Sequence, residues 1–193
     1  SYAVVKILHG FLYLVACGGF KDGYSEATLK GLSAVASYHK VNYVIVEANF
    51  GDGMFVQLLK PVMSRVHPVV IEEVKHSTQK ERRICDTLEP ILNQHRLVVD
   101  IAVIEEDAKA EPKRQLFFQM SRISREKGAL AKDDRLDVLS IAVAYWVEQM
   151  ARDTEQAAED HRQSQLEAAL RDFIGTTKGI NTGGKGGSRG RWF

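Results

Sequence analysis

Tyr43-Val44-Ile45-Val46-Glu47 is the stretch of sequence that decides the fold. Its first four residues form an unbroken apolar run, which is typical of a central strand covered on both faces. Glu47 ends the run, and the segment 48–53 that follows (Ala-Asn-Phe-Gly-Asp-Gly) indicates a turn into a helix. The sequence therefore predicts a carboxylate at the carboxyl end of a buried strand, which is the sheet edge where α/β proteins build their sites.

Strand and helix patterns alternate on both sides of this run. Two β-like runs joined at Gly10 predict a hairpin near the N-terminus, and Pro90 predicts a kink or an end in the helix that contains it. The order of the elements predicts an α/β domain with a mixed sheet over residues 1–150, followed by a helical extension over 151–174. The predicted strands are 3–9, 11–16, 43–46, 69–74 and 96–99, and the predicted helices are 25–38, 52–65, 80–94, 113–125 and a long helix from about 133.

Length and composition set broad limits. A chain of 193 residues with a formal net charge of +1 is long enough for one ordinary domain with a sizeable core. Cys17 and Cys85 lie far apart without metal-ligand spacing, which favours a reducing intracellular compartment over a disulfide framework. No apolar run approaches the roughly 18 residues that span a bilayer, and the N-terminus lacks the features of a signal peptide. We therefore expect a soluble, cytoplasmic protein.

The segment 175–193 is rich in glycine and basic residues, which predicts a flexible tail. Residues 179–185 match the G-x-x-x-x-G-K pattern of a phosphate loop, but Gly186 stands where that loop needs Ser or Thr, and no strand precedes it. An ATP site is therefore not expected. Contacts between the tail and nucleic acid phosphates are favoured instead, with Trp192 and Phe193 available for stacking.

Three aspartates, Asp133, Asp134 and Asp137, crowd the start of the last predicted helix. Aspartate caps free N–H groups at helix N-termini, so capping is one interpretation. Three aspartates exceed what capping needs, and they repel one another at their i,i+3 and i,i+4 spacings. A divalent cation shared with Glu47 would offset that repulsion, whereas helix capping or a salt bridge is the alternative role for Glu47. Oxygen ligands without a His or Cys cluster indicate Mg²⁺ or Mn²⁺ rather than zinc.

Basic side chains surround these acids in the sequence. Such clusters are usually solvated faces, but basic rims beside an acidic metal site also suit a polyanion that the bound cations cleave. The residues that we predict to contact DNA are Lys75, Lys80, Arg82, Arg83, Arg122, Arg125 and Lys132.

The order of hairpin, helix, strand ending in Glu47, helix, strand and a last helix opened by the aspartates resembles a known family. It is similar to the ribonuclease H-like nuclease domain of the terminase large subunit of tailed bacteriophages, most of all short-tailed ones. The resemblance covers roughly residues 2–149. Its motifs are Val46-Glu47-Ala48-Asn49-Phe50-Gly51, Lys80-Glu81-Arg82-Arg83-Ile84 running into Leu88-Glu89-Pro90, Leu116 to Ile123, and Gly128-Ala129-Leu130 ahead of the aspartates.

The resemblance implies a metal-dependent DNA endonuclease that cuts concatemeric viral DNA with two Mg²⁺ or Mn²⁺ ions. Glu47 would be the acid on the central strand. Asp133 and Asp134 would supply the acid at the start of the last helix, with Asp134 favoured as the direct ligand and Asp137 in support. The implied partners are double-stranded DNA, an N-terminal packaging ATPase domain that is absent here, the small terminase subunit and the portal. The implied location is the host cytoplasm, at the procapsid.

One departure from the family concerns the first strand, on which a further aspartate is expected. The chain opens in what resembles the second strand, so we expect that strand and its acid to precede Ser1. Asp22 and Asp52 are substitutes by residue type alone. Two alternatives stay open: another ribonuclease H-like nuclease, such as a resolvase or transposase core, and a non-catalytic module that binds DNA or a portal.

Overall fold

Five strands and six α-helices form the part of the chain that this computed structural model describes, residues 1–48 and 53–180. Side chains are described as far as Arg171. The mixed α/β class predicted from the sequence is confirmed. In chain order the elements are β1 (Tyr2–Leu8), β2 (Phe11–Gly18), α1 (Glu26–Tyr38), β3 (Tyr43–Glu47), α2 (Met54–Val66), β4 (Val70–Val74), α3 (Lys80–Asn93), β5 (Leu97–Val99), α4 (Ile101–Ala108), a 3₁₀ turn (Pro112–Arg114), α5 (Leu116–Arg122) and α6 (Asp134–Ile180).

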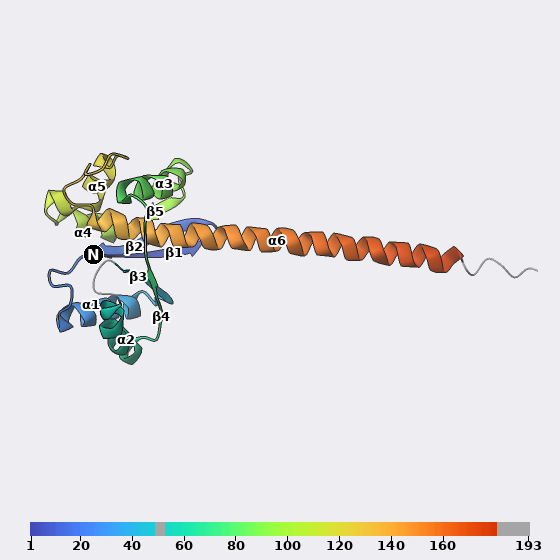
Figure 1. Ribbon diagram of the computed structural model, residues 1–193, viewed down its shortest axis with the longest axis horizontal. Coiled ribbons are helices and arrows are strands. Elements are labelled where there is room, and N and C mark those ends of the chain that lie inside the picture. Colours follow the sequence, from blue (N-terminus) through green and yellow to red (C-terminus); the bar gives the residue numbers. More distant parts are fainter. Residues whose placement is uncertain (49–52, 181–193) are drawn as a thin grey trace, which may run out of the picture. The chain divides into compact units, whose positions relative to one another are not determined.

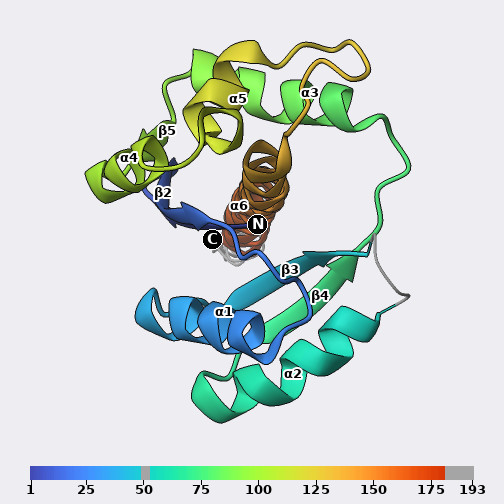
Figure 2. The same ribbon diagram turned by 90° about the vertical axis from the view of Figure 1, so that its left-hand side faces the viewer.

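The described strands form two sheets. One sheet has the order β1-β2-β5, in which β1 and β2 are antiparallel and β2 and β5 are parallel. The other sheet pairs β3 with β4 in parallel, with Tyr43 opposite Val70 and Glu47 opposite Val74. Figure 2 shows the two sheets with the start of α6 between them.

The β1–β2 hairpin closes on His9 and Gly10, whose φ angles are 49° and 77°. Two successive positive φ angles match the twist of paired strands in a two-residue turn. Glycine adopts such an angle without steric cost, so Gly10 allows the tight connection that the sequence predicts.

Helices α1 and α2 cover one face of the β3–β4 sheet (Figure 2). Leu29 and Ala36 of α1 and Leu59 and Met63 of α2 form a buried cluster against that face. Val44 and Val46 of β3 pack on this cluster. Because successive side chains of a strand point to opposite faces, Tyr43 and Glu47 must face the other side of the sheet.

The α6 segment 134–148 lies on that other side. Tyr145 stacks on Tyr43 with ring centroids 4.8 Å apart, and Trp146 Nε1 donates to the carbonyl of Val5 at 3.1 Å. Four apolar side chains of this segment are fully or almost fully buried; they are Leu136, Leu139, Ile141 and Val143. This packing brings the predicted acids of α6 to the face of β3 that carries Glu47.

Contacts divide the chain into two units, Ser1–Glu148 and the part from Gln149 onward. Helix α6, labelled in Figure 1, has the bounds Asp134–Ile180 and so includes residues of both units. In the second unit every described side chain from Ala151 to Arg171 is exposed. No described helix is both long enough and apolar enough to cross a membrane.

Several elements differ from the sequence-based expectation. The sequence pattern did not predict α4, which Asp100 caps by accepting the Ala102 N–H at 2.9 Å. The helix predicted over 113–125 is a 3₁₀ turn followed by α5, and α3 continues one turn beyond Pro90. Helix α6 extends through 175–180, into the predicted tail. The rest of that tail, 181–193, and the segment 49–52 lie outside the described residues.

Candidate functional site

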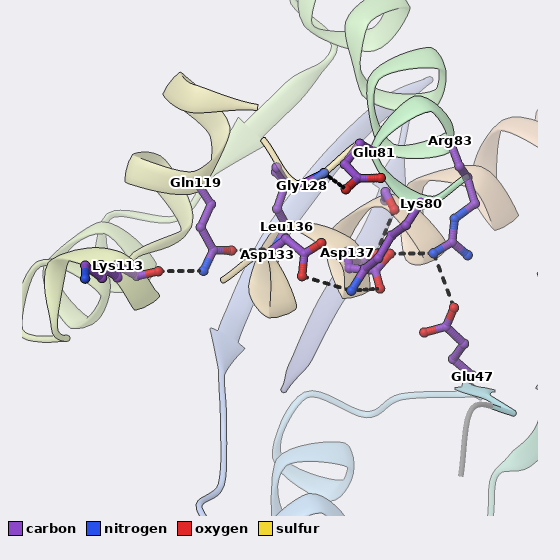
Figure 3. A network of polar contacts seen from close by, with 11 residues as sticks. Glu47, Lys80, Glu81, Arg83, Lys113, Gln119, Gly128, Asp133, Leu136 and Asp137 are labelled. Carbon is purple, nitrogen blue, oxygen red and sulfur yellow. Dashed lines mark hydrogen bonds and ion pairs between the residues drawn. The ribbon is translucent and has the colours of Figure 1, made fainter. Parts of the chain in front are cut away.

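Three of the predicted acids, Glu47, Asp133 and Asp137, are joined by two basic side chains of α3. Figure 3 shows Lys80 between Asp133 and Asp137, and Arg83 between Asp137 and Glu47. The acids come from β3 and from the start of α6, and the bases come from the first turn of α3. The structure thus brings together residues that lie 36 to 54 positions apart in the sequence.

Lys80 lies at equal distance from two carboxylates. Its Nζ is 2.9 Å from Asp133 Oδ1 and 2.9 Å from Asp137 Oδ2. Its side chain is 37% exposed, whereas those of Asp133 and Asp137 are 19% and 5% exposed. The ammonium group therefore sits at the solvent side of a largely buried pair of acids.

Arg83 is placed more deeply. Its Nη2 donates to Asp137 Oδ1 at 2.6 Å and to Glu47 Oε1 at 3.2 Å, and its side chain is 12% exposed. Its Nε and Nη1 atoms are buried and have no hydrogen-bond partner among the described residues. Unpaired donors are costly to bury, so Arg83 has spare capacity to donate to a further acceptor.

Asp137 is the centre of the arrangement, because one of its oxygens faces Lys80 and the other faces Arg83. Burial raises the pKa of Asp137, while the hydrogen bond from Lys80 and the charges of Lys80 and Arg83 act to lower it. Burial lowers the pKa of Lys80, but its hydrogen bonds to Asp133 and Asp137 outweigh this effect, so that its pKa is raised overall. Lys80 thus remains a cation at neutral pH.

The other predicted acids lie elsewhere. Asp134 is exposed, and its side chain makes no hydrogen bond or ion pair with the described residues. Asp22 is exposed, and its main-chain carbonyl accepts the hydroxyl of Ser25 at 3.1 Å. Asp52 falls in the segment outside the described residues. The preference for Asp134 as the direct ligand stays a prediction, whereas Asp133 and Asp137 share a cluster of ion pairs with Glu47.

The start of α6 explains why the carboxylate of Asp133 is free to face Lys80. Asp133 occupies the N-cap position, since its carbonyl accepts the N–H of Asp137 at 2.9 Å. An N-cap aspartate usually accepts a main-chain N–H of the first turn. Here the side-chain oxygen of Gln119, from α5, accepts the N–H of Leu136 at 3.1 Å instead. Gln119 therefore supplies the cap that one interpretation of the sequence gives to Asp133.

A second buried acid holds the same turn from α4. Asp107, 3% exposed, accepts the main-chain N–H groups of Leu116 and Phe117 at 2.8 and 3.2 Å and pairs with Arg135. The sequence patterns indicate no role for Gln119 or Asp107. Gln119 lies between apolar residues and Asp107 follows two glutamates, each on a short helix, and no local pattern indicates which polar side chain there will meet a distant main-chain group.

The chemistry of the acids suits a divalent metal ion, because carboxylate oxygens are the ligands that Mg²⁺ and Mn²⁺ prefer. Within residues 1–48 and 53–171, however, no three His, Cys, Asp or Glu side chains come close enough together to hold one ion. Nitrogen cations stand between the acids instead, at two positions that share Asp137. A divalent ion at the position of the Lys80 ammonium group would therefore meet two carboxylate oxygens, those of Asp133 and Asp137.

The predicted DNA contacts divide into two groups. Lys75, Arg82 and Lys132 are exposed and form no ion pair with the described residues. Arg122 lies over the ring of Phe118, and Arg125 pairs with Asp86 and Glu89 on α3. Lys80 and Arg83 form ion pairs with the acids. Only some of the predicted DNA contacts therefore have a charge that is free to meet a ligand.

Two comparisons with known proteins bear on this arrangement. The ribonuclease H-like domain family of the bacteriophage T7 terminase matches residues 1–97, which include β1 to β4, α3 and the start of β5. The terminase large subunit of Enterobacteria phage T3 is 46% identical to this chain over 153 residues. That alignment covers 75% of this chain and 26% of the relative, so the chain spans about a quarter of the relative's length.

Proposed function

Since the chain belongs to the family of T7-type terminase ribonuclease H-like domains, we propose that it is the metal-dependent DNA endonuclease domain of a viral packaging terminase. The observation that carries the proposal is the shared position of Asp137. One of its oxygens faces Lys80, which also pairs with Asp133, and the other faces Arg83, which also pairs with Glu47. A carboxylate in such a position would be available to both ions of a two-metal nuclease site.

In this proposal Glu47, Asp137 and Asp133 hold two Mg²⁺ or Mn²⁺ ions, and Asp134 is a peripheral ligand. Bound ions of this kind lower the pKa of an attacking water and stabilise the leaving oxygen of a phosphodiester. The chain's own contribution is to fix the acids: β3 carries Glu47, and the capped first turn of α6 carries the aspartates. Because these elements are packed, the main chain that carries the carboxylates is fixed before any ion binds.

The exposed basic residues have the role of holding the DNA backbone. Lys75, Arg82 and Lys132 carry charges that are free to contact phosphates, and such contacts are independent of base sequence. Cutting would therefore show little sequence preference. We further propose that the domain works in the host cytoplasm beside a packaging ATPase domain, the small terminase subunit and the portal.

Cleavage of supercoiled plasmid in the presence of Mn²⁺ tests the proposal, both with this chain and with any longer polypeptide that its gene encodes. We expect Glu47→Gln and Asp137→Asn to lower the cleavage rate on the order of 100-fold or more, since each removes a charged ligand. Asp134→Asn should have a smaller effect, because Asp134 lies outside the acid cluster. Glu105→Gln, on the exposed face of α4, is the matched control and should cut like the wild type.

Two outcomes would count against the proposal. If plasmid stays intact while the protein still binds DNA, the domain is a binding module without nuclease activity. If Asp134→Asn proves the most damaging of the aspartate variants, the sequence-based preference for Asp134 is correct and the central role of Asp137 is not.

A further inference from the structure

We propose that Lys80 is a displaceable counter-ion that holds the acids in place until a first divalent cation takes its position, whereas Arg83 keeps its contacts with Asp137 and Glu47 during that exchange. This inference rests on the proposed function, because it describes how the same acids meet their metal ions. It predicts competition between the Lys80 ammonium group and the metal.

The position of the ammonium group is the first argument. Nζ of Lys80 is 2.9 Å from one oxygen of Asp133 and 2.9 Å from one oxygen of Asp137. The two oxygens therefore converge on one cationic atom, as they would on a metal ion. A Mg²⁺ ion binds oxygen at about 2.1 Å, so each carboxylate would have to close by only ~0.8 Å to bind an ion at that point. The ammonium and the ion cannot occupy this place together.

The difference in burial between the two cations is the second argument. The Lys80 side chain is 37% exposed and leaves from the first residue of α3, so its flexible stem can swing the ammonium group into water. The Arg83 side chain is 12% exposed, and it is the partner of Glu47 as well as Asp137. Displacing Arg83 would strip both acids of their countercharge, which is costly for buried carboxylates.

The charge of the cluster is the third argument. With all groups ionised, three carboxylates and two bases leave one negative charge uncompensated. Replacing the single charge of Lys80 by a divalent ion would neutralise the cluster. The exchange is thus favoured by the electrostatics of the site, and it would free the ammonium group at the solvent side, where a DNA phosphate could accept it.

Binding and stability measurements on Lys80→Met test the inference without relying on activity. Methionine keeps an unbranched stem and removes the charge. We expect the thermal transition of the metal-free Lys80→Met protein to lie below that of the wild type, because Asp133 and Asp137 then repel each other. Isothermal titration with MnCl₂ should show Mn²⁺ binding about tenfold tighter than in the wild type, and Mn²⁺ should raise the transition temperature by more. Lys80→Arg should keep the metal-free stability.

Two further variants serve as controls. Lys109→Met removes an exposed lysine that pairs with Glu106, and it should alter neither the metal-free transition nor the Mn²⁺ affinity. Lys80→Met combined with Asp133→Asn has the same net charge in the cluster as the wild type. The double variant should regain the stability that Lys80→Met loses. If Lys80→Met alone does not fold, the double variant still tests the inference.

The outcomes separate this inference from the proposed function. Equal Mn²⁺ affinity in the wild type and Lys80→Met would overturn the counter-ion role and leave the metal site standing. An unchanged metal-free transition in Lys80→Met, or no recovery in the double variant, would also overturn it. Failure of every variant and of the wild type to bind Mn²⁺ would contradict both the inference and the proposed metal site.

Discussion

At the level of single residues, the buried charges of Asp137 and Arg83 compensate each other. Both side chains are largely buried, and their contact of 2.6 Å is the shortest of the four ion pairs in the site. A buried ion pair adds little net stability, but removing one partner leaves an uncompensated charge. The buried, unpaired Nε and Nη1 of Arg83 show that the guanidinium is held for its charge more than for complete hydrogen bonding.

We therefore expect Arg83→Met to destabilise the metal-free protein by about 3 kcal/mol, because Asp137 and Glu47 lose their shared cation. Urea unfolding followed by tryptophan fluorescence measures this free energy. Lys109→Met, which breaks an exposed pair with Glu106, is the control and should change it little. A stability for Arg83→Met equal to that of the wild type would mean that the guanidinium is not the countercharge of these acids.

The two cysteines should differ in reactivity. Burial raises the pKa of Cys17 to about 12, and burial raises that of Cys85 as well. Since the thiolate is the nucleophile, Cys17 on β2 should react with iodoacetamide at pH 8 at least roughly ten times more slowly than Cys85 on α3. Mass spectrometry of timed samples measures both rates, and Cys85→Ser should leave the slow reaction alone. Faster labelling of Cys17 would show that β2 opens in solution.

At the level of elements, the first turn of α6 is positioned by other helices. Gln119 on α5 accepts the N–H of Leu136 and donates to the carbonyl of Lys113 at 3.2 Å, as Figure 3 shows. On α3, Glu81 accepts the N–H of Gly128 at 2.6 Å and so anchors the loop that leads into α6. The aspartates of α6 thus owe their orientation to α3 and α5 as much as to their own helix.

Gln119→Leu should loosen this turn, since leucine fills the space but accepts no hydrogen bond. Loss of one buried bond of about 1–2 kcal/mol predicts that the amide of Leu136 exchanges with deuterium on the order of tenfold faster. Gln115→Leu is the matched control, because Gln115 donates to the carbonyls of Ala108 and Ala110 and not to α6. Unchanged exchange at Leu136 in Gln119→Leu would show that the turn is capped by its own residues.

At the level of the whole molecule, the two units differ in how they are stabilised. The unit Ser1–Glu148 contains the buried core residues of the described chain, whereas side chains 151–171 are all exposed. An exposed helix is held by its own hydrogen bonds and by local pairs such as Arg171 with Glu167. The stability of the first unit should therefore not depend on the second.

Deletion of residues 151–193 tests this independence. We expect the near-ultraviolet circular dichroism transition of the shortened protein to stay within about 3 °C of that of the full chain, since little apolar surface loses its cover. The helical signal per molecule should fall, because part of α6 is removed. A drop of the transition by more than about 10 °C would show that the second unit stabilises the first.

The sequence by itself determined the fold class and most of the elements. Period-two and period-3.6 patterns are local, so the hairpin, β3, β4 and α1 to α3 could be predicted from neighbouring residues. Short elements escaped this treatment: α4 is eight residues long and depends on its cap at Asp100. The same local patterns identified Glu47 and the aspartate cluster as candidates for one site.

Only the tertiary structure decided which acids meet. Asp133, Asp134 and Asp137 are similar in sequence terms, yet two of them contact α3 and the third points to solvent. The choice depends on the angle at which α6 starts, which Gln119 and Asp107 set from other helices. The countercharges come from Lys80 and Arg83, more than 50 positions away from the aspartates. Such contacts arise from the packing of whole helices, and no local pattern in the chain encodes them.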